Sequence, residues 1–536
     1  MKKLTLLSGM MACATLVACA TNQAPAARAS AAVGQAAVKP GADLQSVLNS
    51  GADLVLQQGA VYEISEPLIY KKRGQKIFTR DARTPSQFAT LRLANKNVTR
   101  LVYAGGIEGA VMEHVILDGQ RYTLSIRSKA DTGGVTQPSL VYFGGNRGDN
   151  QLVRECVFLN ARSWSTLKVH EGASNVLVEN NFIFGAGSDV RGNGREESEQ
   201  YLKWGDGISF ASRDSIIRNN LVIDSTDVGI VLFGSPGTIA EDNVVASISR
   251  ESLGGTNMVD PLGYYKLTET DTDYRGVRVR NNYVDAYGAR IHIAFPIGAP
   301  QWAPRHRGKF LTGGEVTGNT VAGGAGGYGY VAHTIRNWKI TGNRSTASYS
   351  GLVENEGSED PPDDPAAFVY NPETVVETKL QSDFVPSVRH LNHLLRTHAP
   401  KNEIGYRMHP YGEPEVKAVV AAAYLEMLGR RANSVELNES IELLQSKKAN
   451  ADGLRRRLMA STEFKKRNGD VKSDNLHIYR TRLWFAIYDD IIQKAGKWLP
   501  AREIYFKALD DLKKKNRPMV GVALSLEAPL HSASQS

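Results

Sequence analysis

Basic side chains recur in a strand-like segment that the sequence repeats several times. The copies "STLKVHEG" and "ARIHIAF" place Lys168, His170, Arg290 and His292 among apolar residues, and Asp206 opens an intervening copy, "DGISFAS". Amines, imidazoles, guanidinium groups and carboxylates are the side chains that transfer protons or neutralise charge in active sites. We therefore treat these five residues as the candidate catalytic groups of the chain.

This set of side chains suits the cleavage of an acidic polysaccharide by β-elimination. The reaction needs a group that neutralises the uronate carboxylate, a base that takes the C5 proton and an acid that protonates the leaving oxygen. Lysine or histidine serves as the base once burial or positive neighbours lower its pKa, and arginine neutralises a carboxylate with two hydrogen bonds. The alternative is that each residue is a solvated polar group on the wet face of a sheet.

Three insertions, near residues 187–205, 249–275 and 297–314, interrupt the repeat. Long loops on a rigid scaffold often carry binding residues. Their aromatic rings can stack on sugars, and their cations can meet acidic groups. The alternative is that the loops only pack against the side of the scaffold. The candidate substrate-binding residues in these loops are Trp204, Tyr264, Trp302, Arg305 and His306.

A repeated asparagine identifies the scaffold that must position these candidates. Segments such as "VLVENNFIFGA", "SIIRNNLVIDS" and "VRVRNNYVDAY" align in one column at intervals of 39, 23, 39, 37 and 24 residues. Repeats of this length that consist of short strands indicate a solenoid. We predict an all-β right-handed parallel β-helix followed by a smaller all-α domain. The column contains Asn181, Asn220, Asn243, Asn282, Asn319 and Asn343.

Each asparagine of this column is expected at a buried corner, where its amide bonds the coils above and below. Asparagine also tolerates the left-handed conformation that a tight corner requires. In the second strand type, alternation predicts which residues face the core. These inward residues are Leu167, Val169, Ile208, Phe210, Ile230, Leu232, Ile291 and Ile293. The outward column is then Lys168, Ser209, Val231 and His292.

The start of the repeat, "DLQSVLNSGADLVLQQGAVYEISEPLIY", resembles the first segment of pectin-lyase-like β-helices. In that family a short amphipathic helix caps the open end of the solenoid. The resemblance implies such a helix here. Asp43 is expected to cap its N-terminus, with Leu44, Val47 and Leu48 facing the core.

Residues 152–224 resemble the chondroitinase-B and alginate-lyase family. In "VRECVFLNARSWSTLKVHEGASNVLVENNF", Lys168 falls where the catalytic lysine of that family would lie. The family implies a calcium site, but its Gly-Glu-x-Glu ligand segment is not visible, so no cofactor is evident. The family's Arg-His acid is replaced by residues around "SFASRD", which leaves Arg213 as a substitute among the substrate-binding candidates.

Other β-helix enzymes fit less well. Polygalacturonase-type hydrolases need several carboxylates, and "GDGIS" supplies only Asp206. Mannuronan epimerases carry Asp-Pro-His, whereas this chain has Leu262 after Asp260 and Pro261. No metal-ligand cluster of familiar spacing occurs.

A non-catalytic protein that binds polysaccharide or assembles a matrix at the cell surface is the main alternative to an enzyme. Convergence of Lys168, His170, Arg290 and His292 on one groove would favour the enzyme. Scatter of these residues over a flat face would favour the binding protein.

The N-terminus predicts export and lipid anchoring. Lys2 and Lys3 precede an apolar run too short to span a bilayer, as in a secretory signal, and Leu16 to Cys19 resembles a bacterial lipobox. We expect residues 1–19 to be a lipoprotein signal whose Cys19 takes the lipid, and residues 20–40 to be a flexible tether. The residue after Cys19 is alanine, which by analogy points to the outer membrane, on its periplasmic or surface face. Cys156 then remains alone, so no internal disulfide is expected.

Charge and periodicity divide the rest of the chain. We predict the β-helix over residues 41–353, an acidic proline-rich linker over 354–370 and a basic helical domain over 371–536. Of the net charge of +8, the last segment carries +7, with 27 Lys/Arg and 20 Asp/Glu. The basic character therefore says nothing about the ligand of the β-helix.

The helical segment resembles modules of unknown role on bacterial exported proteins. Its stripe of Val416, Val419, Val420, Tyr424 and Leu428 indicates a buried helix face. Basic runs at 455–457, 465–467 and 513–515 are either solvated surface or a contact for an anionic polymer, lipopolysaccharide or an envelope protein. No nucleic-acid partner is expected of an exported lipoprotein.

Overall fold

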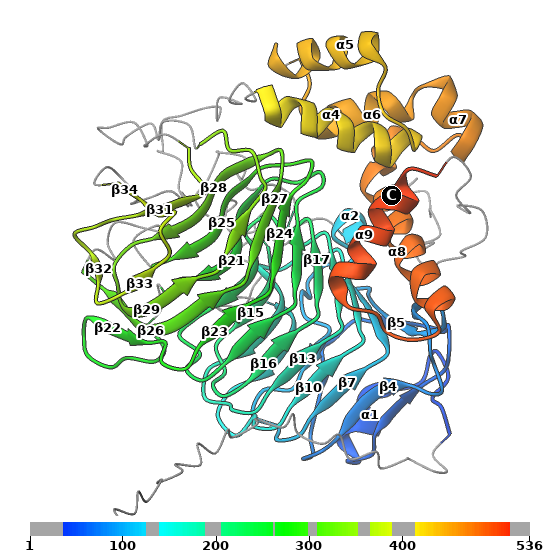
Figure 1. The fold of residues 1–536 in the computed structure, drawn as a ribbon. Helices are drawn as coiled ribbons and strands as arrows, with labels where there is room; N and C mark the ends of the chain where they lie inside the picture. The colour runs from blue at the N-terminus through cyan, green and yellow to red at the C-terminus, as the bar shows by residue number, and fades with distance from the viewer. Residues whose placement is uncertain are drawn as a thin grey trace, which may run out of the picture. The chain divides into compact units, whose positions relative to one another are not determined.

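The computed structural model of the protein describes residues 36–124, 139–187, 205–260, 263–298, 308–351, 365–387, 413–446 and 448–514. Three long parallel sheets occupy the first part of these ranges, and helices occupy the last part (Figure 1). Successive strands visit the three sheets in turn, so each coil adds one strand to each sheet. The fold is a right-handed parallel β-helix followed by α-helices, as the repeat predicted.

The pairing order of the strands defines the three sheets. Sheet A contains β1 (Leu54–Leu56), β4 (Lys76–Thr79), β7 (Val111–Glu113), β10 (Leu152–Arg154), β13 (Leu177–Glu179), β16 (Ile216–Arg218), β19 (Ile239–Glu241), β23 (Arg278–Arg280), β26 (Phe310–Thr317), β29 (Ile335–Thr341) and β32 (Val375–Val376), with β22 (Asp271–Asp273) on β26 and β33 (Lys379–Leu380) on β29. Sheet B contains β2 (Val61–Ile64), β5 (Ala89–Leu93), β8 (Val115–Asp118), β11 (Val157–Leu159), β14 (Phe182–Phe184), β17 (Leu221–Ile223), β20 (Val244–Ala246), β24 (Tyr283–Ala286), β27 (Thr320–Gly323) and β30 (Arg344–Ser345). Sheet C contains β3 (Leu68–Ile69), β6 (Val102–Tyr103), β9 (Ser139–Gly144), β12 (Ser165–His170), β15 (Asp206–Phe210), β18 (Val228–Leu232), β21 (Ser252–Met258), β25 (Ile291–Ile297), β28 (Gly326–Ala332), β31 (Phe368–Tyr370) and β34 (Val385–Pro386).

Short helices accompany the β-helix, and longer ones follow it. The first group is α1 (Leu44–Asn49), the 3-10 turn η1 (Pro85–Gln87) and α2 (Arg121–Leu124). The second group is α4 (Glu413–Leu428), α5 (Ser434–Gln445), α6 (Ala451–Met459), α7 (Thr462–Asn468), η5 (Ser473–Asn475), α8 (Leu476–Ala495) and α9 (Ala501–Leu512). Within the described ranges, no helix combines the length and the apolar character needed to cross a bilayer.

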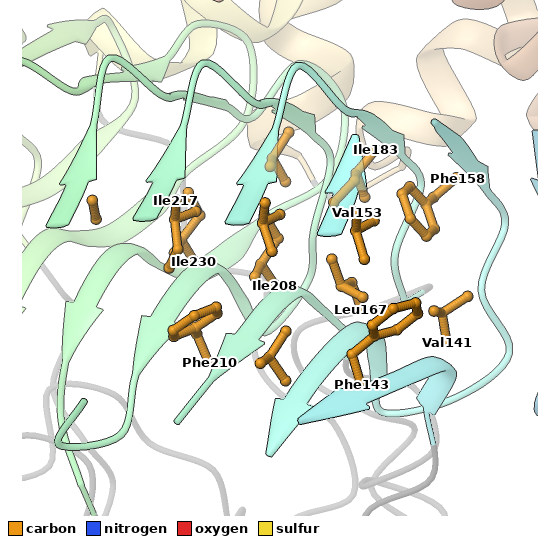
Figure 2. Packing of buried hydrophobic residues seen from close by; sticks show 14 of the residues in the cluster. Val141, Phe143, Val153, Phe158, Leu167, Ile183, Ile208, Phe210, Ile217 and Ile230 are labelled. Carbon is orange, nitrogen blue, oxygen red and sulfur yellow. The ribbon is translucent and has the colours of Figure 1, made fainter. Parts of the chain in front are cut away.

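Apolar side chains from all three sheets fill the inside of the coils (Figure 2). Leu167, Ile208 and Ile230 pair in register along sheet C, and each is fully buried. Because burying one such side chain contributes roughly 1.5–3 kcal/mol, the stacked rows hold successive coils together. The predicted inward residues lie in this core, with the exception of Ile293, which belongs to a separate cluster with Tyr328 and Val331.

The strands of sheet C do not alternate strictly. A Cβ atom on Gly207 would lie 2.6 Å from Val222 Cγ1, and one on Gly229 would lie 2.3 Å from Val245 Cγ1, so both glycines face the core. The next residue of each strand, Ile208 or Ile230, also faces the core. Two inward residues in a row leave residues three positions apart, such as Asp206 and Ser209, on the same outer face. Strict alternation does not predict this arrangement.

The asparagine column forms a continuous buried ladder, which confirms the prediction. The Nδ2 atom of each member donates to the Oδ1 atom of the next at 2.9–3.0 Å, from Asn181 through to Asn343. Each Oδ1 also accepts the backbone N–H of the preceding member. The left-handed conformation lies one residue earlier, at Asn180, Asn219 and Asn281, rather than at the ladder residue itself.

The N-terminal cap follows the sequence prediction. Asp43 Oδ1 accepts the backbone N–H of Ser46 at 3.0 Å, which caps α1. Leu44 and Leu48 are buried against the first coils, and Val47 packs on them partly buried. The cap therefore removes the exposed end of the core.

The β-helix continues beyond the predicted boundary at residue 353. Strands β31 and β34 extend sheet C, and β32 and β33 extend sheet A, up to Pro386. The Phe368 ring stacks on Tyr330 with centroids 4.8 Å apart, so this coil carries its own core residue. The described residues of 365–387 are thus β-helix rather than linker or helical domain. These strands are only two or three residues long, and so they gave no clear periodic signal.

The helical region packs on the outer face of sheet B. One apolar cluster contains sheet B residues such as Phe182 and Phe184 together with α8 residues such as Trp484 and Tyr488. The rings of Phe182 and Tyr488 stack with centroids 4.4 Å apart. The predicted stripe of α4 is buried in the same cluster. The outer face of sheet B is therefore an internal surface.

Buried ion pairs join the helices to the β-helix. Arg480 of α8 contacts Asp224 at 2.6 Å and Glu426 of α4 at 2.8 Å, and Arg455 contacts Glu426 at 2.6 Å. All four side chains are essentially unexposed. The assignment of Arg455 to an exposed basic face was wrong, because this side chain compensates a buried carboxylate.

Candidate functional site

Lys168 lies on the outer face of sheet C, in the fourth of its eleven strands. Its Nζ atom lies 5.7 Å from the centroid of the Trp164 ring, and the residue is only 3 % exposed. The residue faces outward, as the alternation predicted, but surrounding side chains leave little of it exposed, so it is not a solvated surface lysine. Burial lowers the pKa of Lys168 to about 8; Asp206 and Glu171 oppose this shift and Arg100 adds to it. A large fraction of the amine is therefore neutral slightly above neutral pH.

Two tyrosines and an arginine continue the face toward the N-terminal coils. Tyr142 is the in-register neighbour of Lys168, and Tyr103 is the in-register neighbour of Tyr142. The two rings stack with centroids 4.9 Å apart. The Cζ atom of Arg100 lies 5.1 Å from the Tyr142 centroid and 5.4 Å from the Tyr103 centroid. Burial raises the pKa of Tyr142 to about 12, so its phenol keeps its proton at neutral pH.

His170 and Tyr264 border Lys168 on the other side. The His170 ring lies 5.7 Å from Tyr142 and 5.3 Å from Tyr264, measured between centroids. Burial and the charge of Lys168 lower the pKa of His170, so its imidazole is neutral. Burial raises the pKa of Tyr264. We define Arg100, Tyr142, Lys168, His170 and Tyr264 as the sheet C site.

Two buried carboxyl groups lie beside this site. Asp206 Oδ2 accepts the hydroxyl of Ser209 at 2.5 Å, and Asp227 Oδ2 accepts the indole N–H of Trp164 at 3.0 Å. Burial raises the pKa of both aspartates, to about 7 for Asp227, and the charge of Asp227 raises that of Asp206 further. Among the described residues, the Oδ1 atoms of both have no hydrogen-bond partner. The pair therefore favours holding a proton close to Lys168.

Arg290 lies away from the sheet C site. Its Nε atom donates to Glu415 Oε1 of α4 at 3.0 Å, and the residue is 5 % exposed. The sequence placed it among the candidate catalytic groups with Lys168. The residue instead occupies the corner between sheets B and C, where α4 contacts the β-helix, and its charge is compensated there.

His292 also lies away from Lys168. Its Nε2 atom is 2.7 Å from Glu251 Oε1. Strand β25 is four strands from β12, which at the spacing of a sheet is roughly 19 Å. The register of β25 places Pro296, not His292, in the column of Lys168, since Ile297 pairs with Met258. The predicted alignment was shifted by four residues because the apolar pattern of β25 fits both registers.

The remaining predicted residues contribute little to this face. Arg213 is exposed beyond the end of β15. Its charge lowers the pKa of Tyr265 and is not among the causes of the shift at Lys168. Trp204, Trp302, Arg305 and His306 lie outside the residues that the structure describes. Within the described ranges, no group of three or more His, Cys, Asp or Glu side chains is arranged to hold a metal ion. Of the predicted site residues, the outer face of sheet C thus brings together Lys168, His170, Asp206 and Tyr264.

Arg100, Tyr103, Tyr142, Glu171 and Asp227 were missed by sequence reasoning. A signal for two of them exists, because "LVYAGG" and "LVYFGG" repeat the same pattern around Tyr103 and Tyr142. Arg100 directly precedes the first copy. Asp227 directly precedes β18, the strand after that of Asp206. It lies two residues before the inward pair of its strand, whereas Asp206 lies one residue before its own, and so alternation did not align the two aspartates.

Comparison with known proteins relates the chain to other β-helices. No protein-family model matches the sequence, and no curated protein matches it. An alginate lyase from Paenibacillus sp. str. FPU-7 is 13 % identical, with a TM-score of 0.32 over 62 % of this chain and 96 % of that one. The tailspike protein of Escherichia coli bacteriophage HK620, in complex with a hexasaccharide, is 12 % identical, with a TM-score of 0.40 over 65 % and 69 %. The A-module of a mannuronan C-5 epimerase from Azotobacter vinelandii is 14 % identical, with a TM-score of 0.33 over 66 % and 98 %. The fold assignment rests on the strand pairing of the chain itself.

The arrangement provides the groups that an elimination reaction needs. Lys168 is a base that is partly neutral near pH 8, Tyr142 and Tyr264 are protonated acids, and Arg100 is a cation. The rings of Tyr103 and Tyr142, which stack on each other, add a half-buried aromatic surface beside these groups. Aromatic side chains and groups that can transfer protons therefore share one face.

Proposed function

We propose that the protein is a polysaccharide lyase that cleaves a uronate-containing polymer by β-elimination. The observation that carries this proposal is the position of the buried Lys168 amine beside the in-register phenol of Tyr142, with Arg100 over the same ring. A base with a pKa near the working pH is the most effective. Burial gives Lys168 this property.

Each group has one role in the proposed reaction. Arg100 neutralises the carboxylate of the uronate, which makes the C5 proton more acidic. Neutral Lys168 takes that proton on Nζ. Tyr142 donates its phenolic proton to the glycosidic oxygen on C4. His170 and Tyr264 hold the sugar and the Tyr142 ring in place.

The proposed step balances within the residues of the site. The C5–H and C4–O bonds break, a double bond forms between C4 and C5, and the leaving oxygen takes the proton of Tyr142. Lys168 then carries one extra proton and Tyr142 lacks one. Because burial favours the neutral form of both groups, transfer of the proton from Lys168 to Tyr142 returns the site to its starting state.

The test is a screen of purified protein against alginate, polygalacturonate, hyaluronate and chondroitin sulfate, with the ultraviolet absorbance of the unsaturated product as the readout. We expect the absorbance to rise with at least one polymer. New reducing ends without this absorbance would indicate hydrolysis and contradict the proposal.

A non-catalytic polysaccharide-binding protein is the second candidate. Its support is that Arg290 and His292 do not converge on Lys168, so only half of the predicted basic cluster is present. Binding to a polymer in the screen, with no product of any kind, would establish this candidate in place of the lyase.

We further propose that the chain is an outer-membrane lipoprotein attached through Cys19. This residue lies outside the described residues, and the proposal rests on the lipobox-like sequence Leu16 to Cys19. A Cys19→Ser variant should leave the membrane fraction, because the acyl chains supply the attachment. Retention of the variant on membranes after a high-salt wash would contradict the anchor.

A further inference from the structure

One outward column of sheet C runs through Lys168 and changes character there. On the N-terminal side its members are Ile69, Tyr103 and Tyr142, which are partly or fully exposed. On the C-terminal side they are Ser209, Val231 and Asn257, which are all buried. The column is therefore open on one side of Lys168 and closed on the other.

Side chains of the chain itself close the C-terminal side. Val231 and Phe233 form an outer apolar cluster with Val228 and Val259, and Trp164 and Tyr264 pack against it. The Phe233 ring meets the Tyr264 ring edge-on, with centroids 6.1 Å apart. A polymer lying on this face would have to displace a packed apolar cluster in order to pass beyond Lys168.

The open side offers a short platform with a positive charge. From β3 to β12 the column spans three strand spacings, or about 14 Å. The stacked rings of Tyr103 and Tyr142 lie in the middle, with the Arg100 guanidinium over both. The Nε atom of Arg100 is buried and, among the described residues, has no hydrogen-bond partner. This side therefore suits a carboxylated sugar.

We infer that the protein acts on chain ends: the polyuronate lies across β3, β6 and β9, and its terminal sugars reach Lys168 against the closed side. This inference rests on the proposed function and adds its mode of action. Each reaction then releases one short product of uniform size, and the polymer does not pass through the site.

Product analysis on the polyuronate that responds in the screen tests the mode of action. Chain-end action should give product absorbance with little early loss of viscosity, and one short oligosaccharide from the first minutes. A rapid fall in viscosity with a ladder of intermediate sizes would overturn the inference and leave the lyase proposal standing.

A binding experiment tests the same inference without turnover. Lys168→Ala protein is titrated by calorimetry with alginate, polygalacturonate, hyaluronate and chondroitin sulfate fragments of two chain lengths. We expect one protein per chain at both lengths of the polymer that binds. A number of proteins per chain that rises with length would overturn the chain-end inference alone, whereas no binding to any of the four polymers would overturn the proposed function and this inference with it.

Two matched variants test which side holds the polymer. Ile69 is 36 % exposed at the open end of the column, and Val385 is 54 % exposed at its opposite end. Ile69→Ala should raise the KM or Kd for fragments about threefold, with kcat unchanged. Val385→Ala should change neither. An equal effect of both variants, or an effect of Val385→Ala alone, would contradict the proposed placement.

Discussion

At the scale of single residues, the main property of the site is the lowered pKa of Lys168. The sequence left either burial or positive neighbours as its cause. Burial is the largest cause, whereas Asp206 and Glu171 favour the ammonium form and Arg100 opposes it. Burial lowers the pKa of an amine even where no other cation lies nearby, because the charged form loses its hydration.

The activity of the protein should rise with pH through the pKa of Lys168. The base must be neutral, so kcat/KM should increase about tenfold per pH unit below pH 8 and level off above it. Glu171→Gln removes a charge that raises this pKa, so it should move the midpoint to lower pH. A profile that is flat between pH 6 and 9 would exclude Lys168 as the base.

The buried carboxyl of Asp227 should make stability depend on pH. Its pKa is about 7 in the folded protein against 3.8 without burial, so folding takes up a proton between these values. The free energy of unfolding should therefore fall as the pH rises from about 4 to about 7, with a slope of up to ~1.4 kcal/mol for each pH unit in this interval.

Asp227→Asn should weaken this dependence, since Asp206 still takes up a proton on folding, and should make the variant more stable than the wild type at pH 8. The measurement is urea unfolding at several pH values. Asp474→Asn is the control, since its side chain is 97 % exposed. Parallel pH curves for the wild type and Asp227→Asn would show that Asp227 does not hold the proton.

Sequence reasoning found some residues of the site and missed others for a physical reason. Lys168 and His170 lie in a strand whose apolar neighbours define its faces. Arg100 precedes its strand, and Tyr142 carries no charge, so neither gave a signal on its own. Their role depends on stacking between coils, which a single strand does not reveal.

At the scale of elements, the asparagine ladder is the feature that the sequence predicted most completely. Buried side-chain amides must be hydrogen-bonded, and amides repeated once per coil satisfy this requirement when each bonds the next. The register of sheet C was predicted less well. Its consecutive inward residues at Gly207 and Ile208 break the period of two. The apolar pattern of β25 fits two registers, and this placed His292 in the wrong column.

Replacement of one ladder residue should destabilise the protein. Asn220 Nδ2 donates to Val178 O at 3.0 Å, and its Oδ1 accepts two N–H groups of Asn181. Asn220→Ala leaves these buried groups without partners and should cost about 1–3 kcal/mol. Asn97→Ala, at an exposed position, should be neutral in the same urea titration. Equal stability of both variants would contradict the ladder's contribution.

At the scale of the whole molecule, the helical region is part of the packing of the β-helix. The sequence predicted both regions but not their contact. Outward apolar residues in sheet B indicate that the sheet is covered, but they do not indicate which part of the chain covers it. Burial raises the pKa of Glu426, but Arg480 and Arg455 outweigh this effect and hold it at about 2. Glu426 therefore stays charged at neutral pH.

Disruption of this buried network should destabilise the fold more than loss of a surface pair. Arg480→Met leaves Asp224 and Glu426 without their shared partner and should cost about 3–5 kcal/mol. Lys494→Met, which removes an exposed pair with Asp490, should change stability by less than ~1 kcal/mol. A similar loss for both in urea unfolding would mean that the helices do not depend on the network.

The role of Lys168 as the base is tested most directly by comparing wild-type and Lys168→Ala protein on the same polyuronate, by initial rates of unsaturated-product absorbance at pH 8. The variant should fold, bind fragments with nearly the wild-type Kd and lose activity by roughly 10²–10⁴-fold, because a positioned base is removed. Full activity of the folded variant would contradict the assignment of Lys168 as the base and, with it, the proposed sheet C site.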